Sequence, residues 1–388
     1  MNWQTALRKE FPVTSRCIYL DAAYDCGGCR IGKSAAARYF DDWAVAASTA
    51  QRGGPGREIF FRVAEETRAQ ISTLLCGVET KNISFTKNTN EGFNSILNGF
   101  DFKEGDNIVT FRKEYPSIVM PCVKAAETKG IECRLISQSE KALPSVDTIW
   151  DSVDEHTVMI LISHVRSETG YKIDLQELGH RCRENGIFLI VDAVQSMGVE
   201  ALPVEEWGIS AVSAATYKNL GGFISVGFIY ICDELLRHIQ PTYVSHNFQL
   251  SLDLSEEKPV IRCSDPLNAS KLDNCSSDYL GIYVMHDALE QINKIGIENI
   301  RKHVSELFGI LYAGLKNLGY SIITPEDANR HCASVALDSP NSKEIVQYFY
   351  DNGVIISGSR IARFSLAAFN NRDDVEKTLE IAARCPYR

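Results

Sequence analysis

Short apolar runs and segments with apolar residues at helical spacing alternate along most of the first 250 residues. The runs at 107–111, 132–136 and 158–163 have the length and composition of strands, and the segments at 118–129 and 175–185 predict helices. This alternation predicts a mostly parallel sheet with helices on both faces.

Two runs near the middle of the chain, residues 188–195 and 211–218, begin apolar and end polar. We expect both to be buried parallel strands that present their last side chains at the carboxyl edge of the sheet. The first run would present Asp192 and Gln195 there, and the second Lys218.

The pattern changes after these runs. Residues 227–231 predict an antiparallel or edge strand, 249–278 are polar and irregular, and 280–295 predict a long helix. A chain of 388 residues suggests one large and one small domain. We predict a large cofactor-binding domain over 16–255, and a small domain made of residues 1–15 together with 256–388.

Lys218 and Asp192 form the pair that a pyridoxal 5′-phosphate (PLP) site requires. A lysine supplies the Schiff-base nitrogen, and a carboxylate keeps the pyridine ring protonated so that it accepts electrons from the substrate α-carbon. Gln195 could donate a hydrogen bond to the phenolic oxygen of the ring. The simpler interpretations are a surface lysine and an aspartate that caps a helix.

The segment 85–94 reads as a strand end, a polar turn and a helix start. Thr89 is the expected N-cap, and the free N–H groups of Asn90 and Glu91 would face a phosphate at the positive end of the helix. Any capped helix resembles this pattern. The prediction of a phosphate site therefore depends on the position of the helix start directly after a strand.

Two further side chains fit the remaining needs of such a site. Tyr115 follows the run at 107–111 and could stack on the pyridine, or it could be a half-buried core aromatic. Arg363 lies in a C-terminal strand-like run and could bind a substrate carboxylate with both guanidinium nitrogens, or form a surface salt bridge.

Bulk composition narrows the class of protein. The formal net charge of −10 argues against nucleic-acid and anionic-membrane partners, and no stretch is apolar enough for a membrane span. Twelve cysteines without a secretion signal indicate reduced thiols in a cytoplasmic protein. Cys26 and Cys29 form a CxxC pair without a second pair nearby, so we expect no metal; a redox role for these two thiols stays open.

These segments together resemble the class V aminotransferase group of fold-type I PLP-dependent enzymes, which includes cysteine desulfurases, C–S lyases and epimerase-like proteins. The resemblance covers nearly the whole chain and implies an α/β fold: a large domain with a mostly parallel seven-stranded sheet flanked by helices, and a smaller α+β C-terminal domain. It rests on residues 19–23, 89–94, 163–165, 191–195, 217–218 with Gly221, and 363–366 with Asn370.

The resemblance implies a role for each matched residue. Lys218 would form the aldimine, Asp192 and Gln195 would contact the ring, Thr89 and Asn90 the phosphate, Tyr115 the ring face and Arg363 the substrate carboxylate. It also places His164, Ser167, Thr216 and Tyr217 among the cofactor contacts, Asp21 and Ala22 beside the substrate, and Ser276 where a neighbouring subunit reaches the phosphate. A homodimer with shared active sites follows.

Four departures from the family pattern matter. Tyr115 stands where desulfurases usually have His. Ala215 replaces a Ser, so that Thr216 or Tyr217 must make its phosphate contact. Ser167, beside an unusual Arg166, replaces an Asn. Residues 357–360 run directly into Arg363 with no Cys and no room for the loop that carries the desulfurase nucleophile.

We therefore expect a PLP-dependent enzyme acting on an amino acid, with Lys218 as the base at the α-carbon and Tyr115 as an acid near the leaving group. A β-eliminating C–S lyase on a cysteine-derived substrate is the first hypothesis. Transamination is the second, and racemisation or epimerisation and cysteine desulfuration follow. A PLP-binding protein that has lost catalysis is the remaining alternative.

Overall fold

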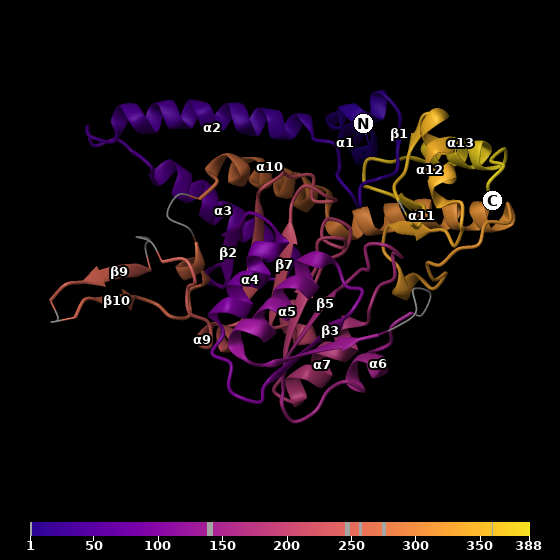
Figure 1. Ribbon diagram of the computed structural model, residues 1–388. Helices are drawn as coiled ribbons and strands as arrows, with labels where there is room; N and C mark the ends of the chain where they lie inside the picture. Colours follow the sequence, from indigo (N-terminus) through magenta and orange to yellow (C-terminus); the bar gives the residue numbers. More distant parts are fainter. Residues whose placement is uncertain (1, 138–142, 245–248, 256–257, 274–276, 359) are drawn as a thin grey trace.

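The computed structural model describes residues 2–137, 143–244, 249–255, 258–273, 277–358 and 360–388 (Figure 1). The helices are α1 (Trp3–Glu10), α2 (Arg30–Thr49), α3 (Glu58–Leu74), α4 (Thr89–Gly99), α5 (Pro116–Lys129), α6 (Val146–Trp150), α7 (Leu175–Glu184), α8 (Val204–Trp207), α9 (Asp233–Arg237), α10 (Tyr279–Ile295), α11 (Ile297–Asn317), α12 (Ser342–Asp351) and α13 (Arg372–Ala382). The strands are β1 (Ile18–Tyr19), β2 (Ile83–Thr86), β3 (Asn107–Phe111), β4 (Glu132–Ile136), β5 (Thr157–Ser163), β6 (Phe188–Asp192), β7 (Ala211–Ala215), β8 (Gly227–Ile231), β9 (Leu250–Asp253), β10 (Val260–Cys263), β11 (Ser334–Ala336), β12 (Val354–Ile355) and β13 (Arg363–Ser365).

Seven strands form one sheet in the order β2-β8-β7-β6-β5-β3-β4. The pairs from β7 to β4 are parallel, whereas β8 is antiparallel to both β7 and β2. The predicted seven-stranded, mostly parallel sheet is confirmed. The strand at 227–231 is antiparallel, as one of the two expectations had it, and it lies inside the sheet rather than at its edge.

Helices cover both faces of this sheet, and the side-chain alternation of β5 shows why. Met159 and Leu161 join the core cluster that contains residues of α4 and α5, whereas Ile160 and Ile162 join the cluster that contains residues of α3, α7 and α10. All four are fully buried. Because neighbouring residues of a strand point to opposite faces, a continuous apolar run is what a sheet covered on both sides requires.

The two central runs become strands over a shorter range than expected. β6 ends at Asp192 and β7 at Ala215, so Gln195 and Lys218 lie on the turns that follow these strands. The first turn of α4 also differs from the expectation: the N-cap is Asn88, whose side chain accepts from Glu91 N (3.0 Å). Thr89 is the first helical residue, so the predicted N-cap was wrong by one position, and Glu91 N–H is occupied by the cap.

The region at 249–278 contains one feature that the sequence pattern did not reveal. β9 and β10 pair antiparallel as a two-stranded ribbon that extends away from the sheet (Figure 1). Leu252 and Ile261 face each other across it, and both side chains are exposed.

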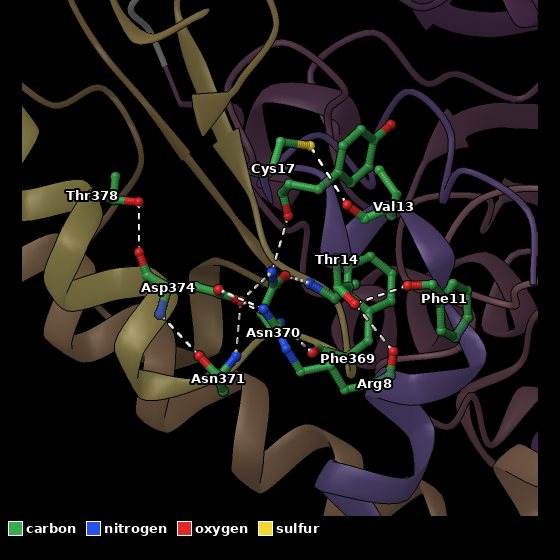
Figure 2. A network of polar contacts seen from close by, with 12 residues as sticks. Arg8, Phe11, Val13, Thr14, Cys17, Phe369, Asn370, Asn371, Asp374 and Thr378 are labelled. Atoms are coloured by element: carbon green, nitrogen blue, oxygen red, sulfur yellow. Dashed lines mark hydrogen bonds and ion pairs between the residues drawn. The ribbon is translucent and has the colours of Figure 1, made fainter. Parts of the chain in front are cut away.

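The N-terminal segment is held against the C-terminal part of the chain by a network of polar contacts (Figure 2). Arg8 makes a two-pronged ion pair with Asp374 (2.7 and 2.9 Å) and donates to the Phe369 carbonyl (3.1 Å). Asn370 donates to Asp374 (3.2 Å) and to the Tyr19 carbonyl (2.9 Å). We therefore propose that residues 1–15 belong with the C-terminal part as one small domain.

Replacing Arg8 with Met is expected to lower the free energy of unfolding by about 1–3 kcal/mol, because the Asp374 carboxylate is buried and would lose its only cationic partner among the described residues. Chemical denaturation measures this loss. Arg372→Met is the matched control, since its ion pair with Glu376 is exposed and should contribute less than about 1 kcal/mol. Equal effects of the two substitutions would contradict the role of the network.

Candidate active site

A cavity of about 800 Å³ lies at the carboxyl edge of the sheet. β3, β5, β6 and β7 are parallel, so the segments that follow them meet at this edge. Six of the predicted site residues line the cavity: Tyr115, Ser167, Gln195, Tyr217, Lys218 and Arg363.

Lys218 is held by a tight turn after β7. Its carbonyl accepts from Gly221 N (2.8 Å) and from the Cys26 thiol (2.7 Å), and Gly221 has a φ of +69°, which favours glycine. The amine is buried, and this burial lowers the pKa of Lys218 to about 8 despite the opposing charge of Asp192. The lowered pKa increases the fraction of unprotonated amine near neutral pH, which is the form that attacks an aldehyde.

Asp192 is the last residue of β6 and is 3 % exposed. Its Oδ1 accepts from Val194 N (2.9 Å), and burial raises the pKa of the carboxyl to about 7. A buried carboxylate that receives one backbone hydrogen bond gains from a cationic partner. Lys218 interacts with it electrostatically, so the lysine and the acid that the sequence paired do lie together.

Tyr115 lies between β3 and α5 at the mouth of the cavity and is half exposed. Its ring centroid is 5.7 Å from Lys218 Nζ, and the ring of Tyr217 is 5.9 Å from the same atom. Two aromatic rings thus flank the amine, and a flat ring system bound to the lysine would lie within reach of both.

Arg363 begins β13 and reaches the cavity from the C-terminal part of the chain. One guanidinium nitrogen donates to the Ser167 carbonyl and the other to Ser357 Oγ (2.9 Å). The ion pair with Asp21 is 3.6 Å long, and Arg363 Nε has no hydrogen-bond partner within the described part of the chain. Burial lowers the pKa of Arg363 and raises that of Asp21. This incompletely satisfied guanidinium suits an anionic ligand.

Other predicted contacts do not line the cavity. Ala22 is fully buried and its N–H donates to the Ser365 carbonyl, while its neighbour Ala23 reaches the cavity instead. His164 is buried beneath the edge, where Nδ1 bonds Ser196 Oγ (2.8 Å) and burial lowers its pKa to about 3.

The predicted phosphate contacts lie on or beside β7. Ser213 Oγ donates to the Thr89 carbonyl (3.3 Å), which places the first turn of α4, with Asn90, against β7. Gly92 permits this approach, since a Cβ there would lie 2.4 Å from Ser213 Oγ. The hydroxyl of Thr216 is used within the lysine turn, where it donates to the Val226 and Phe223 carbonyls (3.0 and 3.1 Å). Ser276 lies outside the described residues.

The cysteine pair also acts on the lysine turn. Cys26 and Cys29 donate to the carbonyls of Lys218 and Gly221, and burial raises the pKa of both thiols. Protonated, inward-facing thiols of this kind hold the turn in place, which argues against a reactive pair. Among the described residues, no group of three metal-ligating side chains is placed to hold a metal ion.

Sequence reasoning missed Glu114, although it identified its neighbour Tyr115. Glu114 lines the cavity, is buried, and pairs with Arg166 (3.0 Å), which was noted only as unusual. The sequence signal that could have identified Glu114 is its position as an acidic residue between the end of β3 and the start of α5.

The donor set fits PLP. One cavity brings together a buried amine with a lowered pKa, a flanking aromatic ring and an incompletely satisfied guanidinium, with a buried carboxylate beside the amine. The amine suits the aldehyde of PLP. The aromatic ring and the carboxylate suit its flat, cationic pyridine ring, and the guanidinium suits a substrate carboxylate.

Comparisons with known proteins agree with a PLP site. The profile of the Aminotransferase class-V family matches residues 34–378. An uncharacterized aminotransferase of Schizosaccharomyces pombe is 27% identical over 83% of this chain and 81% of its own length. The apo structure of a cysteine desulfurase from Thermococcus onnurineus superposes with a TM-score of 0.87 at 20% identity, covering 99% and 98% of the two chains. The cystine C–S lyase C-DES, in complex with cysteine persulfide, gives 0.82 at 19% identity over 97% and 99%.

The chain belongs to the class V aminotransferase family. It is a PLP-dependent enzyme with the fold of the cysteine desulfurases. None of the helices in the described ranges is both long and apolar enough to cross a bilayer.

Covalent attachment of PLP to the apoprotein should become faster as pH rises through about 8 and level off above that, because only the unprotonated Lys218 amine reacts. Borohydride reduction at timed intervals traps the attached cofactor. In Asp192→Asn the favourable charge beside the ammonium is lost, so the inflection should move to lower pH. An inflection near 10.5, the ordinary lysine value, would contradict the effect of burial.

Proposed function

We propose that this protein is a C–S lyase that performs β-elimination on a cysteine-derived amino acid. The observation that carries the proposal is the segment before Arg363. Ser357 pairs with Arg363 through Ser357 N to Arg363 O (3.2 Å) and Arg363 N to Ser357 O (2.7 Å). Ser357 and Arg363 thus form an antiparallel bridge with only five residues of sequence between them, and the sequence has no cysteine between 333 and 384. A desulfurase-like fold without a thiol there favours elimination over transfer of sulfur to the enzyme.

The residues of the cavity would divide the work as follows. Arg363 would bind the substrate carboxylate through its guanidinium, in competition with Asp21. Lys218 Nζ would take the proton from the α-carbon, and the Tyr115 hydroxyl would give a proton to the departing sulfur. Asp192 would stabilise the positive charge on the ring nitrogen. PLP, when bound, supplies the electron sink that makes the α-proton acidic.

The elimination balances as substrate plus water giving pyruvate, ammonia and a free thiol. The name of C-DES, a cystine C–S lyase of the same fold, supports this reaction class. An aminotransferase is the second candidate, and the name of the Schizosaccharomyces pombe relative favours it. Desulfuration by the usual route would need the missing thiol.

We also propose that the enzyme is a cytoplasmic homodimer. Tyr24 and Ile224, at the mouth of the cavity, are exposed, as are Met120 and Phe223. Exposed apolar side chains beside a cavity, such as Tyr24 and Ile224, suit a surface that a partner covers. All cysteines within the described ranges are free thiols, which suits a reducing compartment.

Incubation of the PLP-bound enzyme with S-substituted cysteines, without any keto acid, is expected to release pyruvate and ammonia continuously. Lys218→Ala should lower this rate by at least about a hundredfold, because the base is removed. Arg363→Lys should raise KM more than it lowers kcat, since a single ammonium cannot make the bidentate contact.

Two outcomes would contradict the lyase proposal. Conversion of the cofactor to pyridoxamine phosphate, with turnover only when a keto acid is present, would identify an aminotransferase. Binding of amino acids without any turnover would identify a non-catalytic protein.

Sedimentation velocity is expected to show a single species of twice the chain mass. Ile224→Asp should shift it toward the monomer, because a charge would be buried at the proposed contact. Tyr350→Asp, a change at an exposed aromatic on α12, should leave the dimer intact. A monomeric unmodified protein would rule out the dimer.

A further inference from the structure

Glu114 lies directly before Tyr115, and its carboxylate is almost inaccessible, with a side-chain exposure of 2 %. Both of its oxygens have partners. Oε1 accepts from Ser163 Oγ (2.6 Å) and from Tyr115 N (3.1 Å), while Oε2 accepts from Arg166 Nη1 (3.0 Å). A buried carboxylate with this many donors has a fixed position.

Arg166 fastens the same loop at two further points. Nη2 donates to the Lys113 carbonyl (2.6 Å), and the guanidinium carbon lies 5.1 Å from the centre of the Phe111 ring. One side chain from the segment after β5 thereby holds residues 111, 113 and 114, which lead from β3 to Tyr115. The fork of the guanidinium makes the double contact possible, and a lysine could not reproduce it.

The Arg166–Glu114 ion pair, here called the clamp, also adjoins the opposite wall of the cavity. Ser167, the next residue after Arg166, offers the carbonyl that accepts from Arg363. The short segment 166–167 therefore supports Tyr115 on one side and Arg363 on the other.

We propose that Arg166 and Glu114 are positioning residues: their partly buried ion pair fixes the Tyr115 ring over Lys218 and thereby retains the pyridine ring of PLP. The inference rests on the proposed stacking role of Tyr115. It assigns to the pair a task in cofactor retention, beyond the elimination reaction itself.

The test measures the PLP-bound enzyme without turnover. In Arg166→Met, the rate of PLP release into an excess of a scavenging apoenzyme should rise about tenfold, and the visible circular dichroism of bound PLP should weaken, because the loop loses its clamp. Arg166→Lys keeps the charge opposite Glu114 and loses the fork, so it should give an intermediate rate. Ser163→Ala removes one neutral donor and should have a smaller effect of the same sign.

The matched control is Arg181→Met. Arg181 also pairs with carboxylates, Asp147 (2.9 Å) and Glu177, and lies over the Trp150 ring, but it does not line the cavity. Its loss should lower thermal stability without changing PLP release or the dichroism.

A double-mutant cycle separates positioning from general support. In the Tyr115→Ala background, Arg166→Met should accelerate PLP release less than about twofold, because the ring that it positions is already absent. Additive effects of the two changes, or equal effects of the Arg166 and Arg181 substitutions, would overturn the proposal. If Arg166→Met failed to fold, Arg166→Lys and Ser163→Ala would carry the same comparison.

The outcomes separate this inference from the stacking role of Tyr115 on which it rests, and because they are measured without turnover they do not depend on the lyase assay. If Tyr115→Ala alone leaves PLP release and dichroism unchanged, the stacking role fails, and the inference with it. If Tyr115→Ala has an effect and Arg166→Met has none, only the positioning inference fails.

Discussion

The structure depends on keeping a lysine amine and an aspartate carboxylate buried together at the end of two neighbouring parallel strands. Burying either charge alone would cost free energy. Burial raises the pKa of Asp192 and lowers that of Lys218, so in each case it favours the neutral form. The surrounding elements hold this pair in place. The Lys218 turn is bonded to Cys26, β6 and β7 are buried on both faces, and α4 packs against β7 through Gly92. PLP is the group whose aldehyde and cationic ring suit such a pair.

Much of the fold follows from local sequence. The bounds of β3 and β4 agree with the predicted runs. β3 is buried along its whole length, whereas β4 lies at the edge of the sheet and keeps Glu132 exposed. The ribbon of β9 and β10 was not predicted. Leu250 and Leu252 do alternate with polar residues, but each strand has only four residues and most of them are exposed, so the pattern is short and weak. The sequence predicted Thr89 as the N-cap of α4, whereas the structure has Asn88. Asparagine and threonine both suit an N-cap, so the sequence alone does not select between these neighbours.

Candidate site residues were easier to predict where the side chain itself is reactive or charged. They were harder to predict where their position depends on how the surrounding residues pack. Lys218, Asp192 and Tyr115 were predicted from their positions at or after strand ends, and Arg363 from its place in a C-terminal strand-like run. Ala22 and His164 resemble contacts in sequence, yet packing turns them away from the cavity, and no local pattern reports that direction. Glu114 was missed for the converse reason: its role depends on Arg166 and Ser163, which reach it only after β3 and β5 have paired.

The antiparallel β8 has a consequence for how the protein reaches its native state. The Lys218 turn joins β7 to β8, and β8 is flanked on its other side by β2, which lies far upstream in the sequence. Closing a chain segment of that length costs entropy before any contact repays it, so this pairing is slow compared with local helix formation. We therefore expect the pairing of β8 with β2 to form late in folding, so that the cofactor would meet a nearly finished protein.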